Sequence, residues 1–171
     1  MNTIKKILFI IDALSKAQGF VMAICLIILV FLVVFEVTMR YVFNAPTMWG
    51  TELQLFIYSG ILLLTTAYTL QRRMHAKVDL IVNFLSPRGQ HIVAIVSYLL
   101  FFFPFVLIIF ANGFDFARAS WAIRETSVWS GWQPPLYHVK TIIPVAAFML
   151  FLQGVAELIR HSIYIFKGEE I

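Results

Sequence analysis

Long apolar runs, separated by short polar segments, dominate the sequence. Four runs, at about residues 17–43, 49–70, 91–112 and 141–165, are each long enough to cross a bilayer as a helix, because about 20 apolar residues span about 30 Å of hydrocarbon. The third run continues in a helical pattern towards residue 125, and Pro144 falls in the first turn of the fourth. The pattern predicts an all-α membrane protein with four transmembrane helices, in which residues 1–171 form a single integral membrane domain.

A different periodicity follows the second run. Over residues 72–86, polar residues recur every three or four positions, and apolar residues form a second stripe with similar spacing. This pattern indicates one amphipathic helix, whose apolar stretch is too short to cross the membrane. We therefore expect an interfacial helix between the second and third spans. The side chains expected at its lipid headgroup face are Arg72, Arg73, His75, Lys77 and Asp79.

The composition supports a membrane protein. Hydrophobic residues make up 61% of the chain and charged residues only 13%, whereas soluble domains carry about 25% charged residues. The net charge of +4 reflects lysines and arginines that lie at the ends of the apolar runs. We therefore assign these residues to the membrane surface and expect no nucleic-acid partner. Cys25 is the only cysteine, so no disulfide can form within the chain.

The distribution of lysine and arginine predicts the orientation of the chain, because these residues concentrate in the cytoplasmic loops of membrane proteins. A cytoplasmic N-terminus places all but four of the 13 such residues inside. The four that remain outside are Arg40, Arg118, Arg124 and Lys140. We therefore expect a multi-pass inner-membrane protein with both termini in the cytoplasm.

Charged residues near the outer ends of the first two spans suggest a contact between these helices. Glu36 and Arg40 are four residues apart and can pair along one helix face. Glu52 lies early in the second span, close to Trp49 and across a short link. We expect Glu36, Arg40 and Glu52 to form a triad that, with Trp49, clamps the two helices together. A proton or ion relay is the alternative, but no further acidic residue continues such a path through the membrane.

No constellation of residues indicates catalysis or a resident metal or cofactor. His75 and Asp79 are four residues apart, but a metal site needs three or four ligands. All four histidines fall at membrane edges, whereas a b-type cytochrome needs axial histidines inside its bundle. The sequence contains no phosphate-binding glycine loop, no Ser/His/Asp set and no paired broken helices of a transporter core. We expect no catalytic residue, metal or cofactor in this chain, and therefore no enzyme.

Aromatic and charged residues are interleaved between the third and fourth spans. Trp129 and Trp132 lie there with Arg118, Arg124 and Glu125. One interpretation is an aromatic belt that anchors the loop in the outer membrane interface. The other is a docking surface, because tryptophan and arginine are enriched in binding hot spots. The sequence leaves both interpretations open.

Several of these residues resemble a known family. The first hairpin contains Glu36-x3-Arg40-Tyr41-x-Phe43-Asn44-x-Pro46, followed by Trp49-x2-Glu52. Further matches are His75-x2-Val78-Asp79, Trp132-x-Pro134, Lys140-x3-Pro144 and Leu152-Gln153. Together with the four-span topology, these residues resemble the small DctQ-type membrane subunit of tripartite ATP-independent periplasmic (TRAP) transporters, over nearly the whole chain.

The resemblance implies a role in transport across the bacterial inner membrane. In such systems a soluble periplasmic protein binds the substrate, a large elevator-type subunit carries substrate and Na⁺, and the small subunit braces the scaffold of the large one. The implied partners of this chain are thus the large membrane subunit, the substrate-binding protein and membrane lipids, and Na⁺ is expected in the large subunit. The implied substrates are carboxylates, and the overall pattern is most similar to the sialic-acid type.

Two other functions remain as alternatives. An autonomous four-helix channel or transporter would need polar groups inside the membrane to form a path. A membrane-embedded enzyme such as a lipid transferase would need clustered acidic residues for Mg²⁺, and Glu36 and Glu52 are too few. We therefore favour the scaffold subunit of a secondary transporter.

Overall fold

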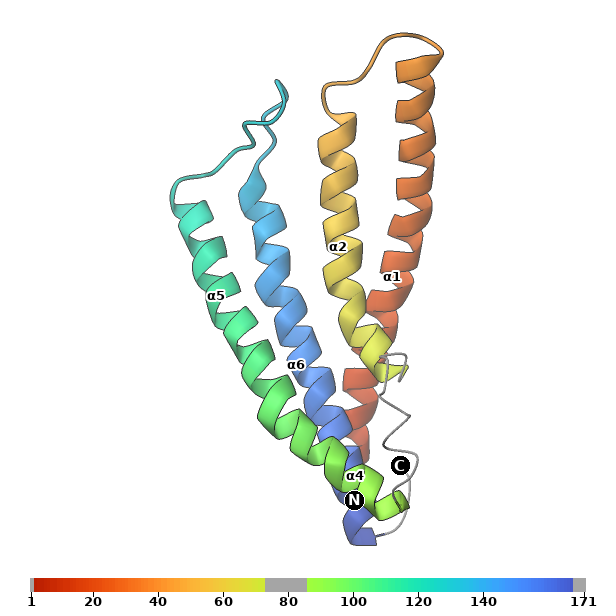
Figure 1. The fold of residues 1–171 in the computed structure, drawn as a ribbon, viewed down its shortest axis with the longest axis vertical. Helices are drawn as coiled ribbons and strands as arrows, with labels where there is room; N and C mark the ends of the chain where they lie inside the picture. The colour runs from red at the N-terminus through yellow and green to blue at the C-terminus, as the bar shows by residue number, and fades with distance from the viewer. Residues whose placement is uncertain (1, 73–85, 168–171) are drawn as a thin grey trace.

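The computed structural model describes residues 2–72 and 86–167, and almost all of them are helical (Figure 1). The elements are α1 (Asn2–Tyr41), α2 (Gly50–Gln71), α4 (Pro87–Ser97), the π-helical turn η1 (Tyr98–Phe102), α5 (Phe103–Ala122) and α6 (Leu136–Lys167). Because α4, η1 and α5 follow one another without a break, the described residues contain four helices long and apolar enough to cross a membrane. The predicted all-α membrane fold with four such helices is confirmed.

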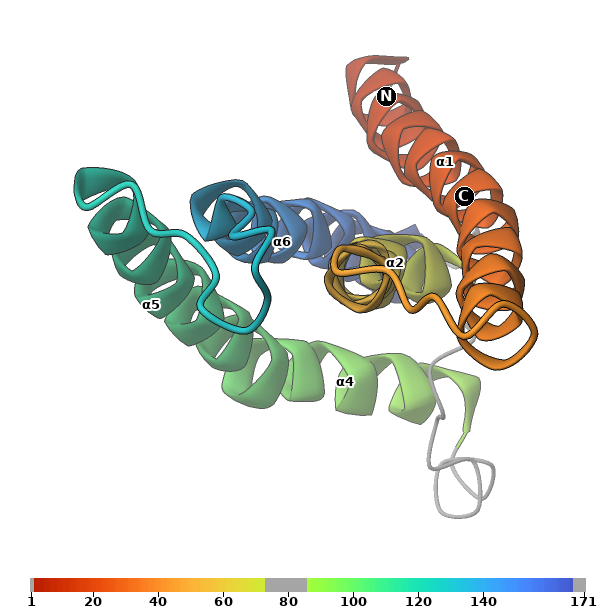
Figure 2. The same ribbon diagram turned by 90° about the horizontal axis from the view of Figure 1, so that it is seen from above.

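The helices form an open row. Seen from above, the order is α5, α6, α2 and α1, and α4 lies along one side of the row (Figure 2). α6 packs against α5, α2 and α4, and α2 packs against α1 and α6. α1 and α5 are therefore the two edges of the row. We call the end that carries the first turn of α1 and the last turn of α6 the terminal end, and the opposite end the loop end (Figure 1).

This arrangement buries few large side chains. The buried apolar residues among those described are mostly alanines, namely Ala67, Ala117, Ala146, Ala147 and Ala156, with Leu8, Leu70 and Val106. Small residues let helix backbones approach closely, which matters in a membrane because lipid tails are as apolar as leucine. Large apolar residues such as Phe31 and Phe101 point outward, with 71% and 73% of their surface exposed. The row thus offers wide apolar faces to lipid or to another membrane protein.

Two glycines mark close approaches between helices. A Cβ atom on Gly19 of α1 would lie 2.5 Å from the Tyr68 ring of α2. One on Gly113 of α5 would lie 2.7 Å from the Ile143 side chain of α6. At both positions the absence of a side chain is what allows the neighbouring helix to pack.

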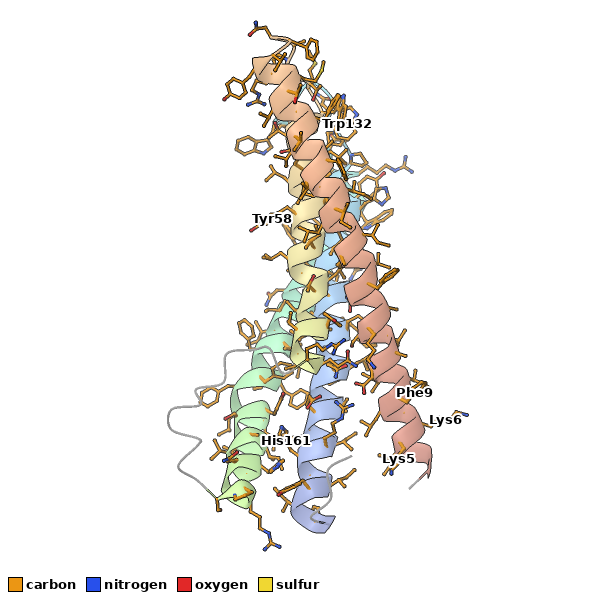
Figure 3. All side chains as sticks on the ribbon, turned by 90° about the vertical axis from the view of Figure 1, so that its right-hand side faces the viewer. Lys5, Lys6, Phe9, Tyr58, Trp132 and His161 are labelled. Carbon is orange, nitrogen blue, oxygen red and sulfur yellow. The ribbon has the colours of Figure 1, made fainter. Side chains whose placement is uncertain are left out.

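α1 is longer than the first expected span. It begins at Asn2 rather than near residue 17, because the segment between contains neither proline nor glycine to interrupt it. Its 40 residues measure about 60 Å at 1.5 Å per residue, about twice the thickness of the hydrocarbon layer. Lys5, Lys6 and Phe9 lie on the extension at the terminal end, and Trp132 lies at the loop end (Figure 3).

The expected position of Pro144 is wrong. α6 begins at Leu136 and not near residue 141, so Pro144 lies inside the helix and not in its first turn. The additional turn contacts the end of α5, since the Tyr137 ring packs against the Trp121 ring with the centroids 4.4 Å apart. Neighbouring helices can stabilise a membrane helix around an internal proline.

The π-helical turn η1 explains how the third helix accommodates Pro104. Proline lacks the N–H that would bond the carbonyl four residues earlier, here that of Leu100, and its ring clashes with that carbonyl in a regular helix. η1 contains Leu100 and directly precedes the proline-containing first turn of α5. This wider turn separates the two groups, and α4 and α5 run in different directions on its two sides (Figure 2).

The predicted interfacial helix lies outside the described residues, apart from its two ends. Arg72 follows the last turn of α2, and Ser86 caps α4 by accepting a hydrogen bond from the Gly89 N–H at 3.3 Å. Pro87 occupies the first turn of α4, where a missing N–H costs little.

We predict that Gly19→Ala destabilises the chain, whereas Gly60→Ala does not. A Cβ on Gly60 would meet only Ile142, at an ordinary 3.7 Å, so this variant is the matched control. Alanine favours a helix over glycine by up to about 1 kcal/mol at either position, but overpacking against Tyr68 should cost about 1–3 kcal/mol. Thermal unfolding in detergent measures the difference, and a Gly19→Ala protein as stable as Gly60→Ala would contradict the close contact.

Candidate functional site

The Glu36 carboxylate organises the connection between α1 and α2. Glu36 is buried, with 4% of its surface exposed. One carboxylate oxygen accepts from the Arg40 guanidinium at 3.0 Å, and the other accepts from the Thr47 hydroxyl. Thr47 in turn accepts from the Gly50 N–H at 3.1 Å, and Arg40 also lies 3.5 Å from the Thr51 hydroxyl. The expected Glu36–Arg40 pair is present, and it closes the link by way of Thr47.

Trp49 adds a second contact between α1 and the link to α2. Its ring stacks on Phe35 with the centroids 6.1 Å apart, and the residue precedes the first turn of α2. Gly50 is buried against Glu36, so close that a Cβ atom there would collide with the carboxylate. The short link is therefore tied to α1 by one stacked ring pair and one charged group.

The expected triad with Glu52 is wrong. Both oxygens of the buried Glu52 carboxylate accept hydrogen bonds from the loop between α5 and α6: one from Ser127 and one from Ser130, the latter at 2.6 Å. Glu52 therefore fastens this loop to the start of α2, and Arg40 pairs with Glu36 instead. A carboxylate in the first turn of a helix is favoured by the partial positive charge of that end.

Backbone hydrogen bonds close the same loop upon itself. The Ser127 N–H donates to the Pro134 carbonyl at 2.9 Å, and the Leu136 N–H donates to the Glu125 carbonyl at 2.9 Å. Arg124 and Gln133 adopt positive φ angles of 47° where the chain turns, a conformation that costs energy for residues other than glycine. The loop thus has a fixed conformation held by several partners.

The candidate docking residues occupy different places on and near this loop. Val128 and Trp129 form its tip, with 87% and 90% of their surface exposed, and Trp132 is 46% exposed. Arg124 is exposed at the turn after α5, whereas Arg118 lies on α5 itself. The structure therefore groups Arg124, Val128, Trp129 and Trp132, which we call the loop tip, and separates Arg118 from them.

Glu125 has a structural partner. The Lys140 ammonium group lies 2.5 Å from its carboxylate, and the same ammonium lies 4.0 Å from the centre of the Phe116 ring. The hydrogen bond from Lys140 lowers the pKa of Glu125 below its ordinary value. Glu125 is thus held as a carboxylate in the pair that joins the two sides of the loop.

A second polar cluster lies near the terminal end and joins α1 to α6. The Arg160 guanidinium donates to Asp12 of α1 and to Glu157 of α6. The Gln153 amide donates to Asp12 at 3.3 Å and accepts from the Ser15 hydroxyl at 2.8 Å. Gln153 is fully buried, and Glu157 and Ser15 are nearly so. We call these five residues the terminal-end network.

α2 also reaches this network. Its last residue, Gln71, donates from its side-chain amide to the Asp12 carbonyl at 3.1 Å. Arg72, the first residue of the predicted interfacial helix, donates from Nε to the Tyr68 hydroxyl at 3.2 Å. The other expected headgroup residues, Arg73, His75, Lys77 and Asp79, lie outside the described residues.

A histidine pair joins α4 to α6 beyond this network. The Nδ1 atoms of His91 and His161 are 2.7 Å apart, which requires one ring to donate and the other to accept. The His91 ring also stacks on Tyr164, with the centroids 3.8 Å apart. Within residues 2–72 and 86–167, no three histidine, cysteine, aspartate or glutamate side chains gather as metal ligands would.

Comparison with known families identifies the chain. Residues 29–162 match the family described as tripartite ATP-independent periplasmic transporters, DctQ component. The chain belongs to this DctQ family. It is therefore the small membrane component of a TRAP transporter, and no curated protein matches its sequence.

The DctQ match contains all of the polar contacts near the loop end but only part of the terminal-end network. Glu36, Arg40 and Glu52 lie inside the matched segment, together with Ser127 and Ser130. The terminal-end network is divided, because Gln153, Glu157 and Arg160 lie inside the match and Asp12 and Ser15 precede it. Both contacts therefore use residues of the DctQ segment.

Sequence reasoning missed the terminal-end network. Asp12 and Arg160 are 148 residues apart in the sequence. Each of them, taken alone, is equally typical of a solvent-exposed helix end. The available signal was the polar pair Gln153 and Glu157, four residues apart, which interrupts the apolar face of the last span. Two such groups on one membrane helix are expected to have partners on a neighbouring helix.

We predict that Arg160→Met strongly destabilises the DctQ chain. Only 15% of the Arg160 side chain is exposed, and removing one partner of a buried ion pair typically costs about 3–5 kcal/mol because the other charge is stranded. Arg118→Met, at an exposed position on α5, should change the melting temperature much less. Thermal unfolding in detergent compares the two variants.

A compensating variant tests the cause of this loss. Adding Asp12→Asn and Glu157→Gln to Arg160→Met removes the stranded carboxylates and should recover part of the stability. A triple variant no more stable than Arg160→Met alone would show that unpaired charge is not the reason.

Proposed function

We propose that this DctQ chain is a static brace for the large, Na⁺-coupled elevator subunit of its transporter. The observation that carries this proposal is the open row of helices: charged and amide side chains near its two ends join helices to one another, and much of its outer surface is apolar. Such a row can cover the side of a larger membrane protein. The substrate and Na⁺ would then be carried by the large subunit, with no cofactor in this chain.

The transported substrate is proposed to be an organic acid with a carboxylate group. This follows from the resemblance of the first hairpin and the loop residues to the family, which is greatest for the sialic-acid type. Sialic acid is therefore the first substrate to test, followed by C4-dicarboxylates.

The orientation proposed from lysine and arginine places the terminal end in the cytoplasm and the loop end in the periplasm. In this orientation Arg160 lies on the cytoplasmic side, and Arg40 and Lys140, paired with Glu36 and Glu125, lie on the periplasmic side. The loop tip would then face the compartment of the substrate-binding protein.

We further propose that the loop tip helps to dock the substrate-binding protein. Val128 and Trp129 are almost fully exposed, yet the loop that carries them is fixed by Glu52 and by its own backbone hydrogen bonds. A preorganised surface loses less entropy when it binds. An aromatic anchor with an arginine beside it is a typical hot-spot combination.

The main proposal is tested by reconstitution in proteoliposomes with an inward Na⁺ gradient and labelled sialic acid. We predict no uptake by this chain alone, and Na⁺-dependent uptake when the large subunit and the binding protein are added. The control omits only this chain and should show much lower uptake. Specific uptake by the chain alone would establish an autonomous transporter, and full uptake without it would exclude the bracing role.

The docking proposal predicts that Arg124→Glu raises the concentration of binding protein needed for half-maximal uptake. Charge reversal at the edge of an interface slows association, by about tenfold at low ionic strength, and excess binding protein should restore the maximal rate. Arg72→Glu, near the terminal end, is the control and should leave the curve unchanged. Unchanged curves for both Arg124→Glu and Trp129→Ala would contradict docking and leave the aromatic belt, anchored in the membrane interface, as the interpretation of this loop.

A further inference from the structure

The two edges of the helix row differ in polarity. Along α1, every exposed side chain between residues 20 and 35 is apolar. Along the outer half of α5, Asn112, Asp115 and Arg118 are exposed on successive turns. α1 and α5 lie at opposite edges in the view from above (Figure 2). The exposed surface of the α1 edge is therefore apolar enough to face lipid tails, whereas that of the α5 edge is not.

Asp115 lies at the depth of the hydrocarbon layer. Gly60 of α2 and Gly113 of α5 are at nearly the same height, because added Cβ atoms would contact the adjacent residues Ile142 and Ile143 of α6. Counting along α2 and α5 at 1.5 Å per residue then places Asp115 about 9 Å closer to the membrane centre than Glu52.

Glu52 marks the outer boundary of this layer. Glu52 and Gln71 lie near the two ends of α2, about 28 Å apart at the rise of an α-helix, which is close to the hydrocarbon thickness of about 30 Å. Trp49 and Trp121 lie near the loop end of the same row, as expected for aromatic residues at the membrane interface.

Within the described part of the chain, no ion pair compensates the Asp115 carboxylate at this position. The lysines and arginines that the structure describes form their ion pairs with Glu36, Glu125, Asp12 and Glu157, and none with Asp115. Asn112, one turn deeper, bonds the Ile108 carbonyl of its own helix at 2.8 Å. Exposed charges within a membrane are rare, and they usually face protein or a water-filled cavity.

We propose that the α5 edge around Asp115 is the contact surface for a transmembrane helix of the large subunit, which presents a lysine, arginine or other hydrogen-bond donor to the carboxylate. The proposal rests on the bracing function and specifies the edge that is used. Lipid tails offer no donor at this depth. A second copy related by a twofold axis along the membrane normal would place Asp115 opposite Asp115, which is unfavourable.

Photo-cross-linking in cells that express both subunits tests which edge is covered. A photoreactive residue replaces Ile108 or Ala111, which are exposed on α5 and leave Asp115 intact. The matched controls replace Ile27 or Phe31, exposed on α1. The α5 positions should cross-link to the large subunit, and the α1 positions should give little or no such product. Cross-links from α1 alone, or from α5 to a second copy, would overturn the proposal.

The Asp115 side chain is tested by co-purification of the large subunit with the tagged chain. Asp115→Leu should lower the affinity by at least about tenfold, as expected when one partner of a desolvated charge pair is removed. The melting temperature of the isolated chain should not fall, which separates a contact role from a structural one. Undiminished co-purification with Asp115→Leu would overturn the proposal. If the large subunit does not co-purify even with the unaltered chain, the bracing function itself fails.

Discussion

The position of α1 depends on the charged contact between Arg160 and Asp12. α1 packs along α2, but its contacts with α6 are far fewer, and the side-chain bonds between these two helices come from Asp12 and Ser15. Arg160 satisfies one carboxylate on each helix at once. Gln153, on the same helix as Arg160, forms hydrogen bonds with both Asp12 and Ser15. An edge helix with a single long neighbour thereby gains a second attachment.

The hydrocarbon layer explains why the polar contacts are gathered near the two ends. Unpaired polar groups are costly in lipid, so the middle of the row is held by small residues such as Ala67, Ala146 and Gly113, which allow close packing. Near the loop end, Glu36 and Glu52 serve two separate connections, one within the first hairpin and one to the last loop. A row fastened in this way has little freedom to rearrange, which suits a stationary subunit.

The sequence predicted the number and type of the spanning helices because long apolar runs leave few alternatives. It also predicted the Glu36–Arg40 pair, since both residues lie on one helix and their spacing alone brings them together. It did not predict the partner of Glu52, because that partner lies in a loop more than 70 residues later whose fold depends on backbone hydrogen bonds. Asp12 and Arg160 escaped notice for the same reason: contacts between distant helices leave no periodic pattern.

The separation of these partners along the chain has a consequence for assembly during synthesis. Glu36, Arg40 and Thr47 all belong to the first hairpin, so their contact can form as soon as α2 has emerged from the ribosome. Glu52 must wait for Ser127 and Ser130, and Asp12 must wait for Gln153 and Arg160 in the second half of α6. Until then the carboxylates of Asp12 and Glu52 lie at opposite ends of the newly synthesised hairpin without their final partners. The last helix to be made is therefore the one that completes the first, and a chain interrupted before α6 would leave the Asp12 carboxylate without Gln153 and Arg160.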